Sequence, residues 1–174
     1  MGGDIATLAR PFGLRVIAHN RSGSARGGVE LVDLETLLRE SDYLVATLPL
    51  TEDTHHLLDA DRIGQMKSTA YLINIGRGQT VDQAALTEAL KRGGIAGAAL
   101  DVFEREPVDP ADPLLTMDNV IVTPHAIGLT REMLTDVGRS ACRSVLAVAE
   151  GRVPATVINP RALERPRLAN RLRR

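Results

Sequence analysis

The apolar positions of this chain alternate between short runs in which most residues are hydrophobic and longer runs with a helical period. Short runs bounded by turn residues predict strands, and a 3.6-residue period predicts amphipathic helices. The predicted strands are 15–19, 43–47, 70–75, 95–102 and 120–122. The predicted helices are 33–39, 59–66, 82–92 and 131–150. Asp33 and Asp82 stand where N-caps belong, and Gly93-Gly94 predicts the end of the third helix.

Strands that alternate with helices predict βαβ units and a parallel sheet covered by helices on both faces. Right-handed crossovers then favour a doubly wound, Rossmann-type α/β fold. A chain of 174 residues is long enough for one domain with a core. We therefore expect one domain over 1–160, followed by a tail over 161–174.

Composition narrows the classes of partner. The formal net charge is −1 and aromatic residues are only 2%, which argues against a base-stacking nucleic-acid surface. The tail carries six Arg and one Glu, and is interpreted as a frayed, solvated end or, alternatively, as a contact for nucleic acid or an acidic partner. No apolar run approaches the ~20 residues that a membrane helix needs. No leader pattern precedes the domain, so we expect a cytoplasmic protein.

Cys142 is the single cysteine, so the chain has no internal disulfide, and a reducing compartment fits this composition. Cys142 falls in a helical pattern among Ala and Val, which predicts a small core residue.

Charged side chains follow three successive predicted strands. Arg77 stands between two glycines after 70–75, Glu106 follows 95–102, and His125 follows 120–122. Because parallel strands present their carboxyl ends at one edge of a sheet, these three side chains are expected to converge there.

The three side chains together suit the reduction of a 2-oxo acid. An Arg binds a carboxylate through two parallel hydrogen bonds. A His donates a proton to the carbonyl oxygen as a hydride reaches carbon, and accepts it in the reverse direction. A Glu bonded to the other ring nitrogen holds the His in one tautomer. The chemistry needs no metal, and the sequence has no His/Cys cluster with zinc spacing.

Each residue also fits an ordinary structural role when it is taken singly. Arg77 is then a cation in a loop, Glu106 a solvated turn residue before a proline, and His125 a loop residue after a proline. His55 and His56 have no comparable setting and are interpreted as surface residues. The shared edge of the sheet is what favours a site.

Four segments resemble the D-isomer-specific 2-hydroxyacid dehydrogenase family, which includes glyoxylate and hydroxypyruvate reductases and phosphoglycerate dehydrogenase. The segments are 41–54 (SDYLVATLPLTEDT), 74–86 (NIGRGQTVDQAAL), 97–107 (GAALDVFEREP) and 119–130 (NVIVTPHAIGLT). The resemblance runs from about Gly2 to Pro160 and implies an oxidoreductase that transfers a hydride between NAD(P)H and a small 2-oxo or 2-hydroxy acid.

The resemblance implies a role for each matching residue. Arg77 binds the substrate, His125 is the acid/base, Glu106 supports it, and Asp101 holds the nicotinamide end. The backbone lining the cofactor is that of Leu48, Pro49, Ile75, Gly76 and Gly128. Formate dehydrogenases of the same superfamily carry Gln at the position of Glu106, which argues against formate as the substrate.

The resemblance also places the cofactor's phosphate and ribose contacts. Gly2 takes the place of the third glycine of the family's G-x-G-x-x-G fingerprint. After the next strand, NAD-dependent members carry an acidic residue that binds the ribose 2′-hydroxyl, whereas this chain has Asn20, Arg21 and Ser22. Because Arg and Ser are able to bind a 2′-phosphate, we expect NADP(H) in preference to NAD(H); alternatively, Arg21 points to solvent.

The fingerprint's first two glycines and the strand before them would precede Met1, as would a substrate domain. We therefore expect Met1 to be a misassigned start or the edge of a truncated gene, and the chain alone to be inactive and marginally folded. Loss of a central strand leaves two half-sheets. The intact protein is expected to be a homodimeric enzyme. The alternatives are a non-catalytic cofactor-binding or dimerisation module, and a remnant without function.

Overall fold

The computed structural model describes residues 1–24 and 29–172. The chain divides into two compact units, Met1–Ile127 and Gly128–Arg174. Each unit is described by itself. The predicted domain of 1–160 with a separate tail stays a prediction.

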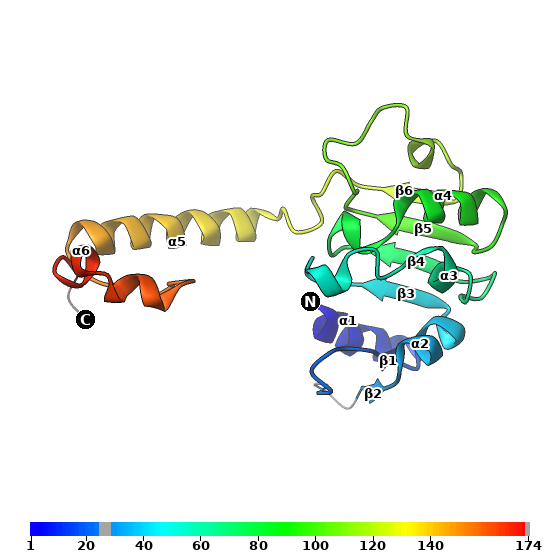
Figure 1. Cartoon of the computed structure of the whole chain (residues 1–174), viewed down its shortest axis with the longest axis horizontal. Helices are drawn as coiled ribbons and strands as arrows, with labels where there is room; N and C mark the ends of the chain where they lie inside the picture. The colour runs from blue at the N-terminus through cyan, green and yellow to red at the C-terminus, as the bar shows by residue number, and fades with distance from the viewer. Residues whose placement is uncertain (25–28, 173–174) are drawn as a thin grey trace. The chain divides into compact units, whose positions relative to one another are not determined.

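Parallel strands form two sheets in the first unit (Figure 1). Four strands pair in the order β3-β4-β5-β6, and the two short strands β1 and β2 pair with each other. Their bounds are Ile17–Ala18 (β1), Glu30–Leu31 (β2), Tyr43–Ala46 (β3), Tyr71–Asn74 (β4), Gly97–Leu100 (β5) and Val120–Val122 (β6). The predicted strands and the parallel α/β fold are confirmed, and the strands lie in two separate sheets as expected.

Helices connect these strands. In the first unit they are α1 (Gly2–Ala9), α2 (Leu34–Glu40), α3 (Ala60–Ile63) and α4 (Gln83–Lys91), with the 3₁₀ turns η1 (Arg10–Phe12), η2 (Glu52–Thr54), η3 (Gly78–Thr80) and η4 (Pro113–Leu115). The side chains of Asp33, Asp59 and Asp82 accept the backbone N–H of the residue three positions on, which confirms the two predicted caps. Gly93 has a φ of 67° just after α4, where a residue with a side chain would be strained.

The core lies between one face of the four-stranded sheet and the helices α2, α3 and α4. Alternate strand residues such as Leu44, Leu72 and Leu100 are buried against Leu38 of α2 and Leu86 of α4. These helices share a face because right-handed crossovers that step in one direction along a sheet stay on one side of it.

The opposite face of the sheet is more open than the sequence predicted. Tyr43 and Tyr71 stack there with ring centroids 5.8 Å apart, and both are exposed, as is Ile121. Helix α1 reaches this face at Thr47, whose Oγ1 would lie 3.1 Å from a Cβ on Gly2. The expected cover on both faces is therefore incomplete within the described part of this unit.

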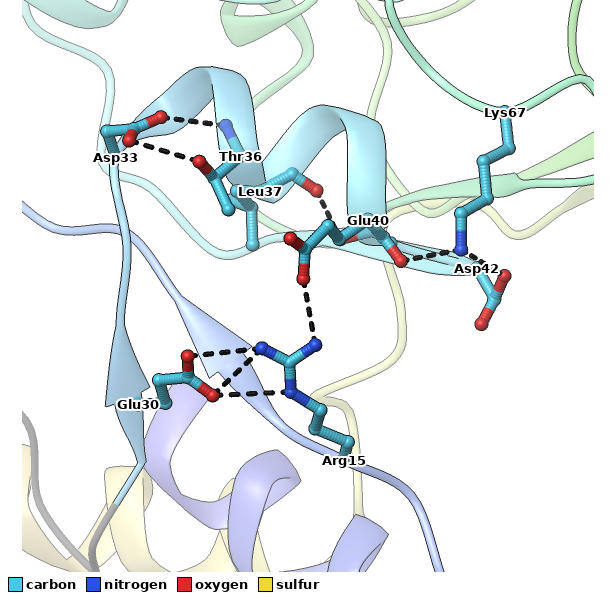
Figure 2. A network of polar contacts seen from close by, with 9 residues as sticks. Arg15, Glu30, Asp33, Thr36, Leu37, Glu40, Asp42 and Lys67 are labelled. Atoms are coloured by element: carbon cyan, nitrogen blue, oxygen red, sulfur yellow. Dashed lines mark hydrogen bonds and ion pairs between the residues drawn. The ribbon is translucent and has the colours of Figure 1, made fainter.

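An exposed network of charges joins the two-stranded sheet to α2 (Figure 2). The guanidinium of Arg15 donates to both carboxylate oxygens of Glu30 on β2, and to Glu40 at 2.8 Å. Lys67 donates to the backbone oxygen of Glu40 and to the carboxylate of Asp42. The side chains carrying these bonds are all substantially exposed, so solvent and salt weaken the ion pairs.

The second unit contains α5 (Arg131–Ala149), η5 (Pro160–Glu164) and α6 (Pro166–Ala169). Cys142 is exposed, so its prediction as a core residue is wrong; along α5, only Ala147 is buried. The tail, expected to be frayed, instead forms η5 and α6, and Leu172 is 9% exposed. Apolar residues of the tail thus have local packing that its high charge concealed.

Candidate functional site

Arg77, Glu106 and His125 line a single cavity of about 370 Å³. Arg77 follows β4, Glu106 lies beyond β5, and His125 lies beyond β6, so all three come from the carboxyl ends of neighbouring parallel strands. The structure thus brings together the three residues that the sequence analysis selected, while their chemical roles stay predictions. Gln79 and Glu104 line the same cavity.

His125 and Glu106 form a hydrogen-bonded pair. The Nδ1 atom of the imidazole lies 2.7 Å from Oε2 of Glu106, and the other oxygen, Oε1, accepts the N–H of Phe103 at 3.1 Å. A carboxylate only accepts hydrogen bonds, so Nδ1 carries a proton and donates it to this bond. Among the described residues, no hydrogen-bond partner is found at Nε2, which therefore remains available to a ligand.

The pair is also an electrostatic unit. The hydrogen bond from His125 holds the pKa of Glu106 below its ordinary value; burial opposes this effect, and the N–H of Phe103 supports it. Glu106 is therefore an anion at neutral pH and stabilises a positive charge on the imidazole.

Asp101 holds the backbone that carries His125. Its Oδ1 atom accepts the hydroxyl of Thr123 at 2.6 Å, the N–H of Ala126 at 2.8 Å and the N–H of Ile127 at 3.2 Å. Burial would raise the pKa of this carboxyl, which is 3% exposed, but the hydrogen bonds outweigh burial and the pKa is lowered. The network keeps His125 at a φ of 52°, a conformation that few residues other than glycine adopt.

Two glycines let the segments of the site approach one another. A Cβ on Gly76 would lie 2.7 Å from the backbone oxygen of Leu48, and one on Gly78 would lie 1.8 Å from the backbone oxygen of Phe103. Arg77, between them, donates from its guanidinium to the oxygen of Gly76 at 2.7 Å. The backbone around Arg77 is thus packed against the segments that follow β3 and β5.

The residues after β1 form a loop closed by its own side chains. Asn20 donates to the backbone oxygen of Ser24, and the hydroxyl of Ser22 donates to the side-chain oxygen of Asn20. Arg21 is 87% exposed at its side chain and lies 3.4 Å from Asp53, a weak pair. Through Asp53, which follows β3, Arg21 links this loop to a segment at the carboxyl end of the four-stranded sheet, and its side chain stays open to solvent.

The other residues predicted to contact the cofactor lie in several different segments of the chain. Leu48 and Gly76 touch, Ile75 donates to the oxygen of Ala46, and the oxygen of Pro49 accepts the Thr54 hydroxyl. Gly2 lies beside Thr47, just past the end of β3. Gly128 belongs to the second unit, so its predicted contact stays a prediction.

A larger cavity of about 570 Å³ lies between α2 and α3. Asp33 and Asp59 line it, but their carboxylates already cap those helices. The described residues hold no cluster of three potential metal-binding side chains. Within 1–24 and 29–172, no helix is long and apolar enough to cross a membrane.

A second histidine–carboxylate pair lies beside the cavity, and no pattern in the sequence predicted it. Nε2 of His56, a residue taken as an ordinary surface histidine, lies 2.9 Å from Oε1 of Glu104. Both stand next to segments that were selected, but no local pattern connects them, since β4 and α4 separate them along the chain.

The arrangement supplies an exposed guanidinium, an imidazole with one free nitrogen and a carboxylate beneath it. Such a set binds a small carboxylate and transfers one proton to or from the bound molecule.

Known proteins that resemble this chain belong to the family that the sequence motifs indicated. A family model described as D-isomer specific 2-hydroxyacid dehydrogenase, NAD binding domain, matches residues 1–126. Glyoxylate reductase from Aeropyrum pernix is 44% identical over 163 residues, which cover 91% of this chain and 49% of that protein. Glyoxylate/hydroxypyruvate reductase B from Pectobacterium carotovorum is 44% identical over 146 residues, covering 84% of this chain and 46% of that protein.

A solved structure agrees at the level of the fold. The crystal structure of an NADPH-dependent glyoxylate/hydroxypyruvate reductase from Sinorhizobium meliloti, in complex with NADP and malonate, matches with a TM-score of 0.80 at 33% identity. The match covers 88% of this chain and 49% of that one. The chain spans about half the length of these relatives.

Proposed function

The chain belongs to the D-isomer specific 2-hydroxyacid dehydrogenase family, and from that premise we propose that it is the cofactor-binding part of a glyoxylate/hydroxypyruvate-type reductase. The reaction is the transfer of a hydride between NAD(P)H and C2 of a small 2-oxo acid. The observation that carries the proposal is the 2.7 Å bond between His125 and Glu106 on the cavity that Arg77 also lines.

In the proposed reduction, the guanidinium of Arg77 binds the substrate carboxylate and turns the 2-oxo group toward His125. The cofactor, when bound, supplies the hydride that reaches C2. The proton on Nε2 of His125 moves to the carbonyl oxygen and completes the hydroxyl group. Glu106 keeps Nδ1 protonated and stabilises the imidazolium that must exist before transfer.

The residues at the strand ends fit a nicotinamide dinucleotide. Ligands of parallel α/β sheets lie outside the carboxyl ends of the strands, where Leu48, Gly76 and Asn20 stand. Gly76 lets the segment after β4 pack closely against the Leu48 backbone, where a Cβ would lie 2.7 Å from the Leu48 oxygen. The dinucleotide would run from the loop at Asn20 toward the cavity at His125.

We favour NADP(H) over NAD(H). The loop after β1 offers the exposed guanidinium of Arg21 and the hydroxyl of Ser22, which suit a 2′-phosphate dianion. The Sinorhizobium meliloti relative is NADPH-dependent and binds NADP, which supports the same choice. Arg21→Glu should reverse the preference, as measured by the affinity of the chain for NADPH and NADH.

Activity is tested in a hybrid that carries this chain in place of the matching half of the Aeropyrum pernix reductase, with the chain alone in parallel. We expect the hybrid to oxidise NADPH with glyoxylate or hydroxypyruvate. His125→Asn should lower kcat about 10²- to 10⁴-fold, since the general acid is lost. Asn tolerates a positive φ and retains a donor toward Glu106, so the backbone is preserved.

A hybrid that binds NADPH but does not oxidise it would contradict the proposal that the protein is an enzyme. It would favour a non-catalytic cofactor-binding module. An unchanged kcat in His125→Asn would show that another group supplies the proton.

A further inference from the structure

A second histidine–glutamate pair lies next to the proposed site. Nε2 of His56 is 2.9 Å from Oε1 of Glu104, and each side chain is about one-third exposed. Glu104 lines the cavity that holds Arg77, Glu106 and His125, whereas His56 is not among the cavity's lining residues. His56 can therefore act on the cavity only through its neighbours.

The backbone of His56 is held in an unfavourable conformation. Its φ is 47°, in the left-handed region that only a few per cent of non-glycine residues adopt, among which His, Asn and Asp are the more frequent. Its N–H donates to the backbone oxygen of Gln79 at 2.8 Å, and its ring stacks on His55 with centroids 4.1 Å apart. These contacts keep the ring beside Glu104 at a cost in backbone strain.

Glu104 and Gln79 are themselves tied together. The side-chain amide of Gln79 donates to the backbone oxygen of Glu104 at 2.7 Å. Oε1 of Glu104 accepts the N–H of Gln83 at 2.8 Å, and the side chain of Gln83 accepts the N–H of Glu104 at 2.9 Å. The hydrogen bonds form a closed set that His56 joins through its backbone N–H, and its ring lies in contact with the carboxylate of Glu104.

The bonded residues lie beside the proposed substrate and proton-transfer groups. Gln79 is two positions after Arg77, and Glu104 is two positions before Glu106. A displacement of Gln79 relative to Glu104 therefore changes the separation between the guanidinium and the His125–Glu106 pair. Orientation on this scale controls whether a bound acid presents its carbonyl to the proton donor.

We propose that His56 and Glu104 are positioning residues that set the spacing between the Arg77 segment and the Glu106 segment. In this proposal the pair acts by holding these two segments, and its side chains take no part in hydride or proton transfer. The proposal rests on the function proposed above for its meaning in turnover, but the coupling of the two segments is a property of the chain itself.

The test uses three variants of the 174-residue chain. His56→Leu removes the polar contact with Glu104, whereas His56→Gln keeps an amide donor near the position of Nε2 and has the same positive φ. His55→Gln is the matched control, because His55 stacks on His56 without bonding to Gln79 or Glu104.

The first readout is the NMR signals of the Arg77 side-chain Nε–H and of the amides of Glu106 and His125. We expect His56→Leu to shift or broaden all three, and the two Gln variants to leave them near their wild-type positions. The second readout is a titration with oxalate as the probe anion. Its Kd should rise about 10-fold in His56→Leu alone, which corresponds to about 1.4 kcal/mol of binding free energy.

Changes confined to residues 52–58 in His56→Leu would overturn the proposal, as would equal changes in His56→Gln. Should His56→Leu not fold, Glu104→Gln applies the same test, because it keeps the shape of the side chain and removes its charge. If the wild-type chain does not bind oxalate, the proposed function is contradicted. The NMR signals of the variants would still test the positioning role of His56 and Glu104.

Discussion

Two parts of the first unit come from the same alternation of strands and helices, but they are held by different forces. Where β5 and β6 end, the buried carboxylate of Asp101 accepts hydrogen bonds from three donors in the segment around His125. The two-stranded sheet of β1 and β2 is tied to α2 by the exposed charges of Arg15, Glu30 and Glu40 (Figure 2).

The difference matters because hydrogen bonds to a buried charge are strong and directional, whereas exposed ion pairs contribute little and are screened by salt. The proposed catalytic residues lie in the first part, which needs a fixed geometry. The loop proposed to choose between NADP(H) and NAD(H) follows β1 in the second part. We therefore expect substitutions to separate the two parts by the size and the salt dependence of their effects.

The largest effect is expected from Gly78→Ala. Its Cβ would lie 1.8 Å from the backbone oxygen of Phe103, so the Arg77 and Phe103 segments must separate. We expect a loss of about 3 kcal/mol or more in the free energy of unfolding, at the upper end of overpacking effects. Urea denaturation measures this, with Gly3→Ala as the control, since no atom lies within 4 Å of its Cβ.

Asp101→Ala should rank second. It leaves the Thr123 hydroxyl and the N–H groups of Ala126 and Ile127 without their acceptor, which we expect to cost about 3 kcal/mol after partial rescue by water. Asp101→Asn keeps an oxygen in place and should recover most of this loss. Thermal unfolding measures both variants beside Asp118→Ala, a substitution of an exposed residue. If Asp101→Ala loses no more stability than Asp118→Ala, the two parts do not differ in the way described above.

Low pH should reduce the free energy of unfolding through the protonation of Glu106, which lies in the part of the unit that contains the proposed site. Its folded-state pKa lies below the ordinary value of 4.5, so its contribution is present above pH 4.5 and is lost as pH falls through the folded pKa. The free energy of unfolding should therefore fall more steeply below pH 4.5 in the wild type than in Glu106→Gln. Parallel curves would mean that the bond to His125 does not stabilise the fold.

Arg15→Ala should have the smallest effect. The guanidinium and both carboxylates are exposed, so the melting temperature should fall only slightly at low salt. At 1 M salt, where the screening length is only ~3 Å, the variant and the wild type should melt together. A large loss that survives high salt would show that the two-stranded sheet depends on Arg15 as the site depends on Asp101.

Much of the fold was predictable because its signals are local. The strand 120–122 and the caps Asp33 and Asp82 follow from a few neighbouring residues, and the structure confirms them. Cys142 was predicted wrongly because a helical apolar pattern says which face of a helix is apolar, and not whether anything packs on it. The short helices of the tail were not predicted because its many Arg residues indicated a solvated, frayed end.

The candidate site was predictable as chemistry and only partly as geometry. The order of parallel strands places Arg77, Glu106 and His125 at one edge, which the pattern of strands implies. Two contacts depend on segments that lie far apart in the chain. They are the hydrogen bonds of Asp101 to the segment around His125 and the contact of His56 with Glu104. No period or motif within a single segment carries that information.

For this protein, the sequence by itself determined the strands of the four-stranded sheet, the helices between them, and which charged groups stand at the strand ends, but not α1, β2 or α6. Only the tertiary structure decided which of those groups touch, and which glycines have no room for a side chain. The physical reason is range. Backbone preferences and hydrophobic periodicity act over a few residues, whereas a hydrogen bond such as that of His125 with Glu106 requires the whole sheet to place its two atoms 2.7 Å apart.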